Sequence, residues 1–202
     1  IACGETLRRL FTGLAIRSAA AQEALKDHLG SANQLGVACP GGAEKVATTV
    51  QMALDAGCPV MTIDCTNAFN AVSRAALFGP VAEILPAIFE YFARLYGDAD
   101  GAQLLYVMDD GSVEVLRSQS GVQQGDVAGP ALFALALHTV VAELRSKWVR
   151  EGRADLVAFL DDMTIQFAPG TTAVQIQEIF DEIQVALRSI HLEINAGKCA
   201  IL

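Results

Sequence analysis

Two adjacent acidic residues, Asp161 and Asp162, lie inside an apolar stretch of the chain. Val157-Ala-Phe-Leu160 precedes them and Met163-Thr-Ile165 follows, with no glycine, asparagine or proline to relax a turn. Adjacent carboxylates in such surroundings repel each other and lose hydration, which is costly unless a cation neutralises them. Oxygen ligands suit a hard cation such as Mg²⁺. Residues 156–167 are therefore predicted to form two strands with a cation site at their turn; the competing interpretation is an exposed tight turn.

The other Asp-Asp pair has a different context. Asp109-Asp110 precedes Gly111 and joins two predicted strands, at 104–107 and 113–116. A solvated hairpin turn explains this pair, because Asp and Gly are common turn residues. The comparison indicates that the apolar surroundings, and not the pair itself, single out the first site.

Asp64 repeats the unusual pattern, since it closes an apolar run at 59–64 that predicts a buried strand. Alone, Asp64 could cap the segment that follows it. Taken with Asp161 and Asp162, it predicts three carboxylates that converge on metal from two adjacent strands. Two-metal phosphoryl transfer requires such a site, with ions about 3.5–4 Å apart.

Composition narrows the class of protein. Of the 202 residues, 52% are hydrophobic and 18% charged, which excludes intrinsic disorder and predicts a buried core. The most apolar stretch, 129–142, is too short to span a bilayer, and no secretory leader is visible, so no membrane association is expected. The five cysteines include no C-x-x-C pair, which argues against a disulfide framework or structural zinc and favours an intracellular setting, cytoplasm or nucleus. The net charge of −9, taken alone, argues against a protein that binds the phosphate backbone.

Hydrophobic periodicity and turn residues predict a mixture of helices and antiparallel strands, an α+β fold. The helices are expected at 5–28, 43–56, 69–78, from 80 to beyond 92, at 130–151 and from Thr171 or Thr172 onward. The strands are expected at 59–64, 104–107, 113–116, within 156–167 and at 198–202. A turn is expected at 97–101 and a glycine-rich loop at 121–129.

Four segments, in order, resemble the palm motifs of the reverse transcriptase domain, most closely that of non-LTR retrotransposons. They are Thr62-Ile-Asp-Cys-Thr-Asn-Ala-Phe-Asn-Ala-Val72, Ser120-Gly-Val-Gln-Gln-Gly-Asp-Val-Ala-Gly-Pro130 with Leu132-Phe133, Ala158-Phe-Leu-Asp-Asp162, and Leu192-Glu-Ile-Asn-Ala-Gly-Lys198. The segments 1–9 and Asn33-Gln-Leu-Gly36 resemble finger motifs, so the resemblance covers essentially the whole chain. The chain departs from the family at Phe159, where many relatives have Tyr, and at Val127, where they often have Pro.

This resemblance implies a right-hand polymerase: a palm, in which helices back an antiparallel sheet, with partial fingers and no thumb. It divides the chain into a fingers-like helical part (1–58), palm with the first motif (59–100), a fingers-like hairpin and loop (101–124) and palm with the other three motifs (125–202). The thumb and flanking domains are expected in the full-length protein, where they would supply the positive channel that a net charge of −9 does not provide.

The resemblance also implies the catalytic groups. Asp64, Asp161 and Asp162 would hold two Mg²⁺ ions, for which Mn²⁺ can substitute, and the backbone carbonyl of Cys65 would add a ligand. Lys198 matches the lysine of the fourth motif and is expected to protonate the pyrophosphate leaving group as a general acid.

The nucleotide-binding residues follow from the same resemblance. Phe69 falls where the family keeps an aromatic steric gate that collides with a ribose 2′-hydroxyl and so selects dNTPs. Gln124 and Gly125 would line the nucleotide pocket, where Gly125 lets the backbone approach closely. Arg9, or its neighbour Arg8, is expected to contact the triphosphate. Taken without the family, Phe69 fits simple core packing, and the two arginines fit a solvated helix face.

The implied function is that of an RNA-directed DNA polymerase of a retroelement, whose partners are an RNA template, a DNA primer and dNTPs. The 3′-hydroxyl of the primer would attack the α-phosphate of the bound dNTP. Two alternatives stay open. One is an RNA-templated RNA polymerase or nucleotide cyclase on a similar palm. The other is a non-catalytic decayed or interaction domain, which the acidic charge would suit.

Overall fold

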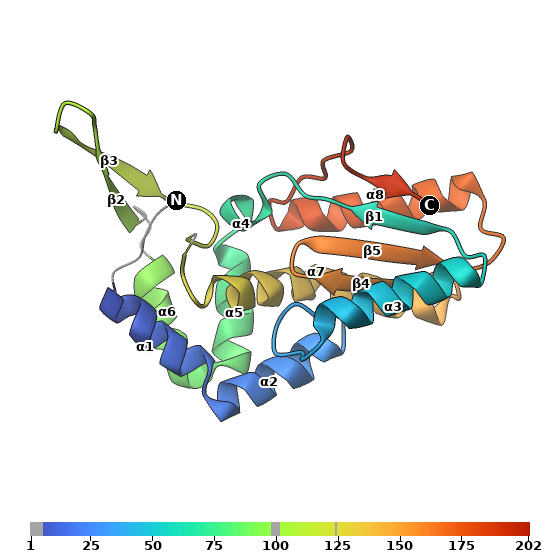
Figure 1. Ribbon diagram of the computed structural model, residues 1–202, viewed down its shortest axis with the longest axis horizontal. Helices are drawn as coiled ribbons and strands as arrows, with labels where there is room; N and C mark the ends of the chain where they lie inside the picture. Colours follow the sequence, from blue (N-terminus) through green and yellow to red (C-terminus); the bar gives the residue numbers. More distant parts are fainter. Residues whose placement is uncertain (1–5, 98–101, 124) are drawn as a thin grey trace.

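The computed structural model describes residues 6–97, 102–123 and 125–202, and it confirms an α+β architecture (Figure 1). In chain order the elements are α1 (Thr6–Ile16), α2 (Ala19–Gly30), α3 (Gly42–Asp55), β1 (Val60–Ile63), α4 (Ala68–Ala71), α5 (Ala75–Ile84), the 3₁₀ helix η1 (Pro86–Ile88), α6 (Phe89–Tyr96), β2 (Ala102–Val107), β3 (Val113–Ser118), α7 (Gly129–Arg150), β4 (Ala154–Phe159), β5 (Asp162–Phe167), α8 (Ala173–Ser189) and β6 (Ala200–Ile201).

The larger sheet is antiparallel and has the strand order β4-β5-β1-β6. β1, from the first half of the chain, therefore lies between β5 and β6 from the end of the chain. This crossover brings the Asp64 segment beside the Asp161-Asp162 hairpin, although nearly a hundred residues separate them in sequence.

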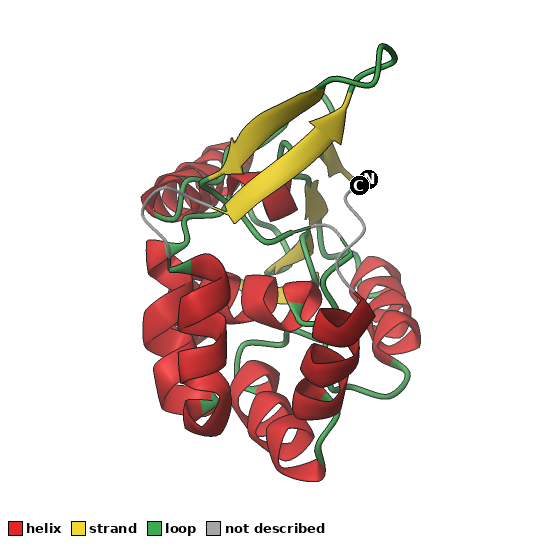
Figure 2. Ribbon diagram, turned by 90° about the vertical axis from the view of Figure 1, so that its left-hand side faces the viewer, coloured by secondary structure: helices red, strands yellow, loops and turns green. Residues whose placement is uncertain are grey.

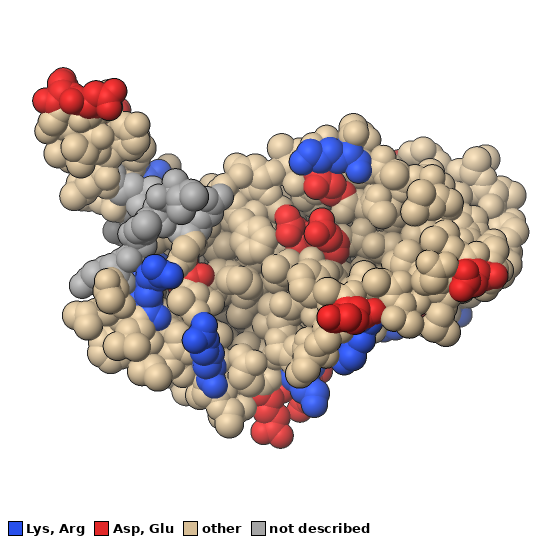
Figure 3. All heavy atoms as spheres, viewed as in Figure 1, with Lys and Arg blue, Asp and Glu red and all other residues tan. Residues whose placement is uncertain are grey.

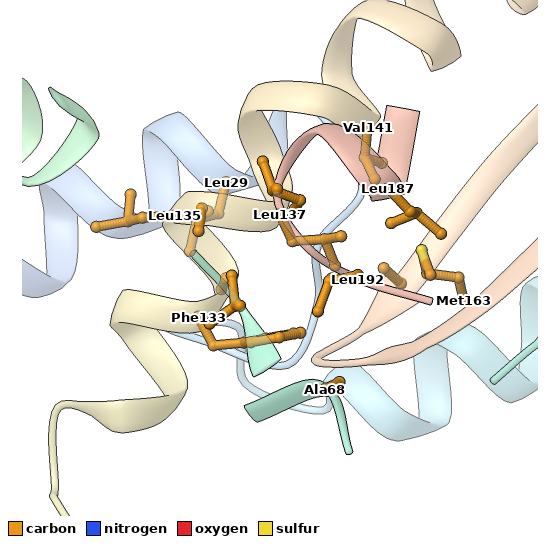
Figure 4. Packing of buried hydrophobic residues seen from close by; sticks show 14 of the residues in the cluster. Leu29, Ala68, Phe133, Leu135, Leu137, Val141, Met163, Leu187 and Leu192 are labelled. Carbon is orange, nitrogen blue, oxygen red and sulfur yellow. The ribbon is translucent and has the colours of Figure 1, made fainter. Parts of the chain in front are cut away.

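Helix α7 lies at the centre of the core. All residues from Ala131 to His138 are buried, so the helix has no solvated face over these two turns. It contacts α2, α5, α8 and β4, which together surround it. Figure 4 shows Phe133, Leu137 and Val141 of this helix packed among Leu187, Leu192 and Met163. The apolar run that could have suggested a membrane helix is thus the buried axis of the domain.

Helix α8 begins as its sequence predicts. Thr172 is the N-cap, and Thr172 and Gln175 form a reciprocal capping box. Ile179, Ile183 and Leu187 are fully buried at helical spacing, on the face turned to the core.

Two predicted helices are broken in the structure by a local cap or by an extended residue. The expected helix 5–28 is divided at Ser18, whose Oγ accepts a hydrogen bond from Ala21 N and caps α2. The expected helix 69–78 is interrupted after Ala71, where Val72 leaves the helical conformation. In each case a local cap or an extended residue overrides the hydrophobic periodicity.

Two X-Pro steps behave differently from each other. A helix was expected to restart at Gly79-Pro80, but α5 runs through this step, since Gly79 lacks the Cβ that would collide with the proline ring. Leu85-Pro86 does interrupt the helix. Leu85 has a Cβ that would collide with the proline ring in a helical conformation, and it adopts φ −127° and ψ 50° instead. α5 and the following η1–α6 segment consequently meet at 119°.

Within the described ranges, no helix taken singly has the length and apolarity needed to cross a bilayer; only the bent pair of α5 with η1–α6 meets those two criteria, when both arms are counted together.

The hairpin β2–β3 stands apart from the rest of the molecule (Figures 1 and 2). Its two strands are in register from Ala102↔Ser118 to Val107↔Val113, as the Asp109-Asp110-Gly111 turn predicts. Apolar side chains are exposed along it: Leu105, Tyr106, Val107, Met108, Val113, Val115 and Leu116. The described part of the predicted turn 97–101 is Gly97 alone; residues 98–101 lie outside the described residues.

A pair of histidines lies between α2 and α7. The rings of His28 and His138 are 4.0 Å apart between centroids, and His138 Nε2 lies 3.1 Å from Ser31 Oγ. Burial, together with the neighbouring His28, lowers the pKa of His138 to about 4. Burial also lowers the pKa of His28, which Glu83 partly offsets.

The depressed pKa of His138 predicts a loss of stability in mild acid. In the unfolded chain this histidine protonates near its usual pKa of about 6.5, so between pH 6.5 and pH 4 the unfolded state binds a proton that the folded state excludes. The free energy of unfolding is expected to fall by about 1–3 kcal/mol across this window. Urea denaturation at pH 7.5, 6 and 5 measures it. His138→Leu should flatten the pH dependence, and the exposed His191→Asn should not; equal slopes for all three proteins would contradict the assignment.

Candidate active site

Asp64 lies one residue beyond the end of β1. The register of β1 and β5 pairs Ile63 with Met163, so the next position, Asp64, lies beside Asp162. On its other side, Asp64 O accepts a hydrogen bond from Asn195 N (2.8 Å), and Cys65 forms an antiparallel bridge with Ile194. The first and fourth motif segments therefore meet here.

The carboxylates form one electrostatic cluster. Burial raises the pKa of Asp161, and the Asp162 and Asp64 carboxylates raise it further. The Cys65 thiol has a pKa raised to about 12 by burial, by Asp161, by Asp64 and by Cys199. Asp64, just beyond β1, is thus near enough to the β4–β5 turn for its charge to act on Asp161. Figure 3 shows acidic side chains gathered in the middle of this face, with basic atoms beside them.

One carboxylate oxygen lacks a partner. Within the part of the chain that the structure describes, Oδ2 of Asp64 is buried and accepts no hydrogen bond. The nearest cation is Nζ of Lys198, at 3.6 Å, which is too long for a hydrogen bond and belongs to a side chain that is 68% exposed. A buried carboxylate oxygen without a donor is costly, and a bound cation would remove that cost.

The chemistry of this cluster fits a hard divalent cation. All three carboxylates offer oxygen ligands, and their mutual repulsion and the unpartnered Oδ2 of Asp64 both favour added positive charge. Among the described residues, no group of three acidic, histidine or cysteine side chains is arranged so that it could hold a metal ion. The carboxylates thus share one neighbourhood without forming a closed ligand set.

The glycine-rich loop lies against the first motif. Val122 N donates to Phe69 O (2.8 Å), and Gly121 N donates to Val72 O (2.9 Å). Gly121 has φ +66°, and a Cβ there would overlap the backbone of Phe69 and Asn70. This close approach needs glycine, which explains the first of the three glycines that mark the loop.

The model of a protein family described as reverse transcriptase (RNA-dependent DNA polymerase) matches residues 8–202, nearly the whole chain. The chain belongs to the reverse transcriptase family. The "RNA-directed DNA polymerase from mobile element jockey" of Drosophila funebris is 25% identical over 143 residues, which are 68% of this chain and 15% of that protein. This reverse transcriptase domain therefore spans a small part of the length of its curated relative.

Solved structures share the fold of the domain. Apo telomerase from Candida tropicalis superimposes with a TM-score of 0.68 at 13% identity, over 98% of this chain and 36% of that chain. Telomerase from Candida albicans in complex with a telomeric RNA fragment gives a TM-score of 0.64 at 11% identity, over 97% and 33%. At these identities the likeness concerns the fold alone, and it confirms the palm-like α+β architecture.

The predicted nucleotide-binding residues of the reverse transcriptase domain are placed as follows. Phe69, on α4, is half-buried and stacks on Phe133 of α7, with ring centroids 4.5 Å apart and planes at 18°. Gly125 has φ +87°, in the left-handed region that favours glycine, whereas Gln124 lies outside the described residues. Arg9 is exposed on α1, and its contact with a triphosphate stays a prediction.

Arg8 is committed to a buried network that the sequence did not reveal. Its guanidinium donates to Asp126 Oδ2 (2.9 Å) and to Gln123 Oε1 (2.7 Å). Asp126, whose side chain is 2% exposed, also accepts from Tyr96 OH (2.5 Å) and from Ala128 N (3.1 Å). Burial and Asp126 raise the pKa of Tyr96, so the phenol stays a donor. The network ties α1 and α6 to the glycine-rich loop.

Arg74 fixes the start of the same loop. It is buried and donates to Ser118 O, Ser120 O and Gly121 O, and its guanidinium lies 5.3 Å from the centre of the Tyr96 ring. Asp126 lies within the second motif segment, whereas Arg74 lies outside all four, and no pattern in the sequence singles it out.

Proposed function

We propose that this domain catalyses RNA-directed DNA synthesis, the transfer of a deoxynucleotide from a dNTP to the 3′-hydroxyl of a DNA primer on an RNA template. The observation that carries the proposal is the convergence of Asp64 with the Asp161-Asp162 turn from two adjacent strands. Membership in the reverse transcriptase family supports it.

Asp64, Asp161 and Asp162 would hold two Mg²⁺ ions, with the Cys65 carbonyl as a further oxygen ligand. When bound, such ions lower the pKa of an attacking hydroxyl and stabilise the leaving oxygen. Lys198 lies beside Asp64 and, in this proposal, delivers the proton that the pyrophosphate leaving group takes up. The chain itself contributes positioning and charge, which is most of what phosphoryl transfer needs.

Extension of a DNA primer on an RNA template, with dNTPs and Mg²⁺, tests the proposal. We expect RNA-dependent extension that stops when the divalent ion is removed. Because the chain carries a net charge of −9, its affinity for template should be weak, and the assay should be run at low salt. Absence of product at low salt, with both Mg²⁺ and Mn²⁺, would favour the interpretation as a non-catalytic domain.

Phe69 should decide between deoxynucleotides and ribonucleotides. Replacing its ring by the methyl group of Phe69→Ala removes the group expected to collide with a 2′-hydroxyl, so discrimination against rNTPs should fall by about tenfold or more. The measurement is kcat/KM for matched dNTP and rNTP incorporation. Phe78→Ala removes a half-buried ring that contacts Phe89 and is the control for lost packing. Unchanged discrimination in Phe69→Ala would assign the ring to core packing with Phe133.

A further inference from the structure

The residue directly before Asp161 has a backbone conformation that its side chain disfavours. Leu160 has φ +58°, in the left-handed region that glycine and asparagine tolerate best. The β4–β5 register pairs Phe159 with Asp162, so Leu160 and Asp161 form a two-residue turn. A leucine stays in this region only when its surroundings determine its conformation.

Gln34 supplies those surroundings. Leu160 N donates to Gln34 Oε1 (2.8 Å), and Gln34 Nε2 donates to Leu160 O (3.0 Å). Gln34 is only 3% exposed, and the same Oε1 accepts from Gly36 N at 3.1 Å, which orients the amide. One side-chain amide therefore satisfies both main-chain polar groups of the turn residue, as a neighbouring strand would.

The backbone around Gln34 is fixed against β4. Leu35 N donates to Ala158 O (2.7 Å), and Ala158 N donates to Asn33 O (3.0 Å). Gly36 permits this approach, since a Cβ there would lie 2.6 Å from Leu160 N and 2.8 Å from Leu160 Cγ. The amide of Gln34 is thus presented to the turn by a segment that cannot easily move away.

We propose that Gln34 is a positioning residue for the carboxylate site: its amide holds Leu160 in the left-handed conformation that keeps the Asp161-Asp162 turn beside Asp64. The inference rests on the proposed function, because it concerns the same site. Gln34 contacts none of the reacting groups and acts through Leu160. Without the amide, the turn relaxes, the repelling carboxylates separate, and the affinity for divalent ions falls.

The decisive variant is Gln34→Met, which keeps the length of the side chain and removes both hydrogen bonds to Leu160. We expect the affinity for Mn²⁺, measured by the relaxation of water protons without nucleotide or primer, to fall by about tenfold. Turnover in primer extension should fall by a similar factor. KM for dNTP should change less than about threefold, since the glycine-rich loop is held by other residues.

Two further variants separate positioning from loss of stability. Asn33→Gly removes a bond from the same loop to the same strand (Nδ2 to Leu156 O, 3.2 Å) and should leave Mn²⁺ affinity and turnover unchanged. Leu160→Gly, added to Gln34→Met, should restore part of both, because glycine adopts φ +58° without the side chain's penalty. Wild-type Mn²⁺ affinity and turnover in Gln34→Met, or equal losses in Asn33→Gly, would overturn the proposal.

The failure of the proposed function would look different. If the parent protein binds Mn²⁺ but extends no primer, polymerase activity fails, and the Mn²⁺ affinities of Gln34→Met and Asn33→Gly still decide the role of Gln34. If the parent also binds no Mn²⁺, hydrogen exchange of the Leu160 amide decides it. Faster exchange in Gln34→Met alone supports a Gln34-held turn, and unchanged exchange overturns it.

Discussion

Replacing Asp161 by asparagine is expected to abolish primer extension, with a loss of at least about 10³-fold, and to stabilise the fold at the same time. The activity falls because a charged oxygen ligand is lost where several kcal/mol of transition-state charge stabilisation are needed. The fold gains because burial and two neighbouring carboxylates disfavour the charged form of Asp161. Primer extension and thermal unfolding in metal-free buffer measure the two effects.

The pH dependence of the free energy of unfolding tests the expected stabilisation of the fold by Asp161→Asn. The folded-state pKa of Asp161 is raised, so in the window between its ordinary pKa and the raised value the folded state binds the proton more tightly. Stability therefore falls as pH rises through this window, and Asp161→Asn should remove that fall. The matched control is Asp109→Asn, which makes the same change in the exposed Asp-Asp turn of the β2–β3 hairpin. A lower melting temperature for Asp161→Asn in metal-free buffer would contradict the view that the charged form of Asp161 destabilises the fold.

Gly121→Ala is expected to destabilise the fold strongly. A Cβ at this position would overlap the backbone of Phe69 and Asn70, and alanine at φ +66° is strained as well. We expect the free energy of unfolding to fall by about 3 kcal/mol or more, because backbone cannot yield as a side chain can. Urea denaturation measures the change.

Gly111→Ala separates the two causes. Gly111 also has positive φ (+83°), but nothing lies within 4 Å of where its Cβ would be. This variant should cost only the conformational penalty, about 1 kcal/mol. Equal losses for both variants would show that conformation alone, and not the close approach of the loop to Phe69, requires glycine at 121.

The sequence predicted those parts of the site that local chemistry makes unusual. Asp161-Asp162 attracts attention because charge interrupts an apolar hairpin, and Asp64 because it ends a buried strand. The structure brings these three together with Lys198. Their catalytic roles, and the division of the chain into palm and fingers segments, stay predictions.

The residues that hold the site could not be found in this way. Gln34 meets Leu160 across 126 positions, and Arg8 meets Asp126 across 118. Neither contact has a periodicity, a spacing or a composition that one sequence can display. The helix breaks at Ser18 and Leu85 were missed for the opposite reason, since the apolar pattern continues on both sides of each break while local caps and a proline ring decide.

The projecting β2–β3 hairpin is anchored to the rest of the molecule at the end of β3. Arg74 donates to Ser118 O where β3 ends, and Gly121, three residues further on, lies against the backbone of Phe69 and Asn70. The end of the hairpin is therefore tied to the start of α5 through Arg74 and to α4, the short helix that follows Asp64, through Gly121. The hairpin projects into solvent, and its base is attached to the same short helix that carries Phe69, whose ring stacks on Phe133.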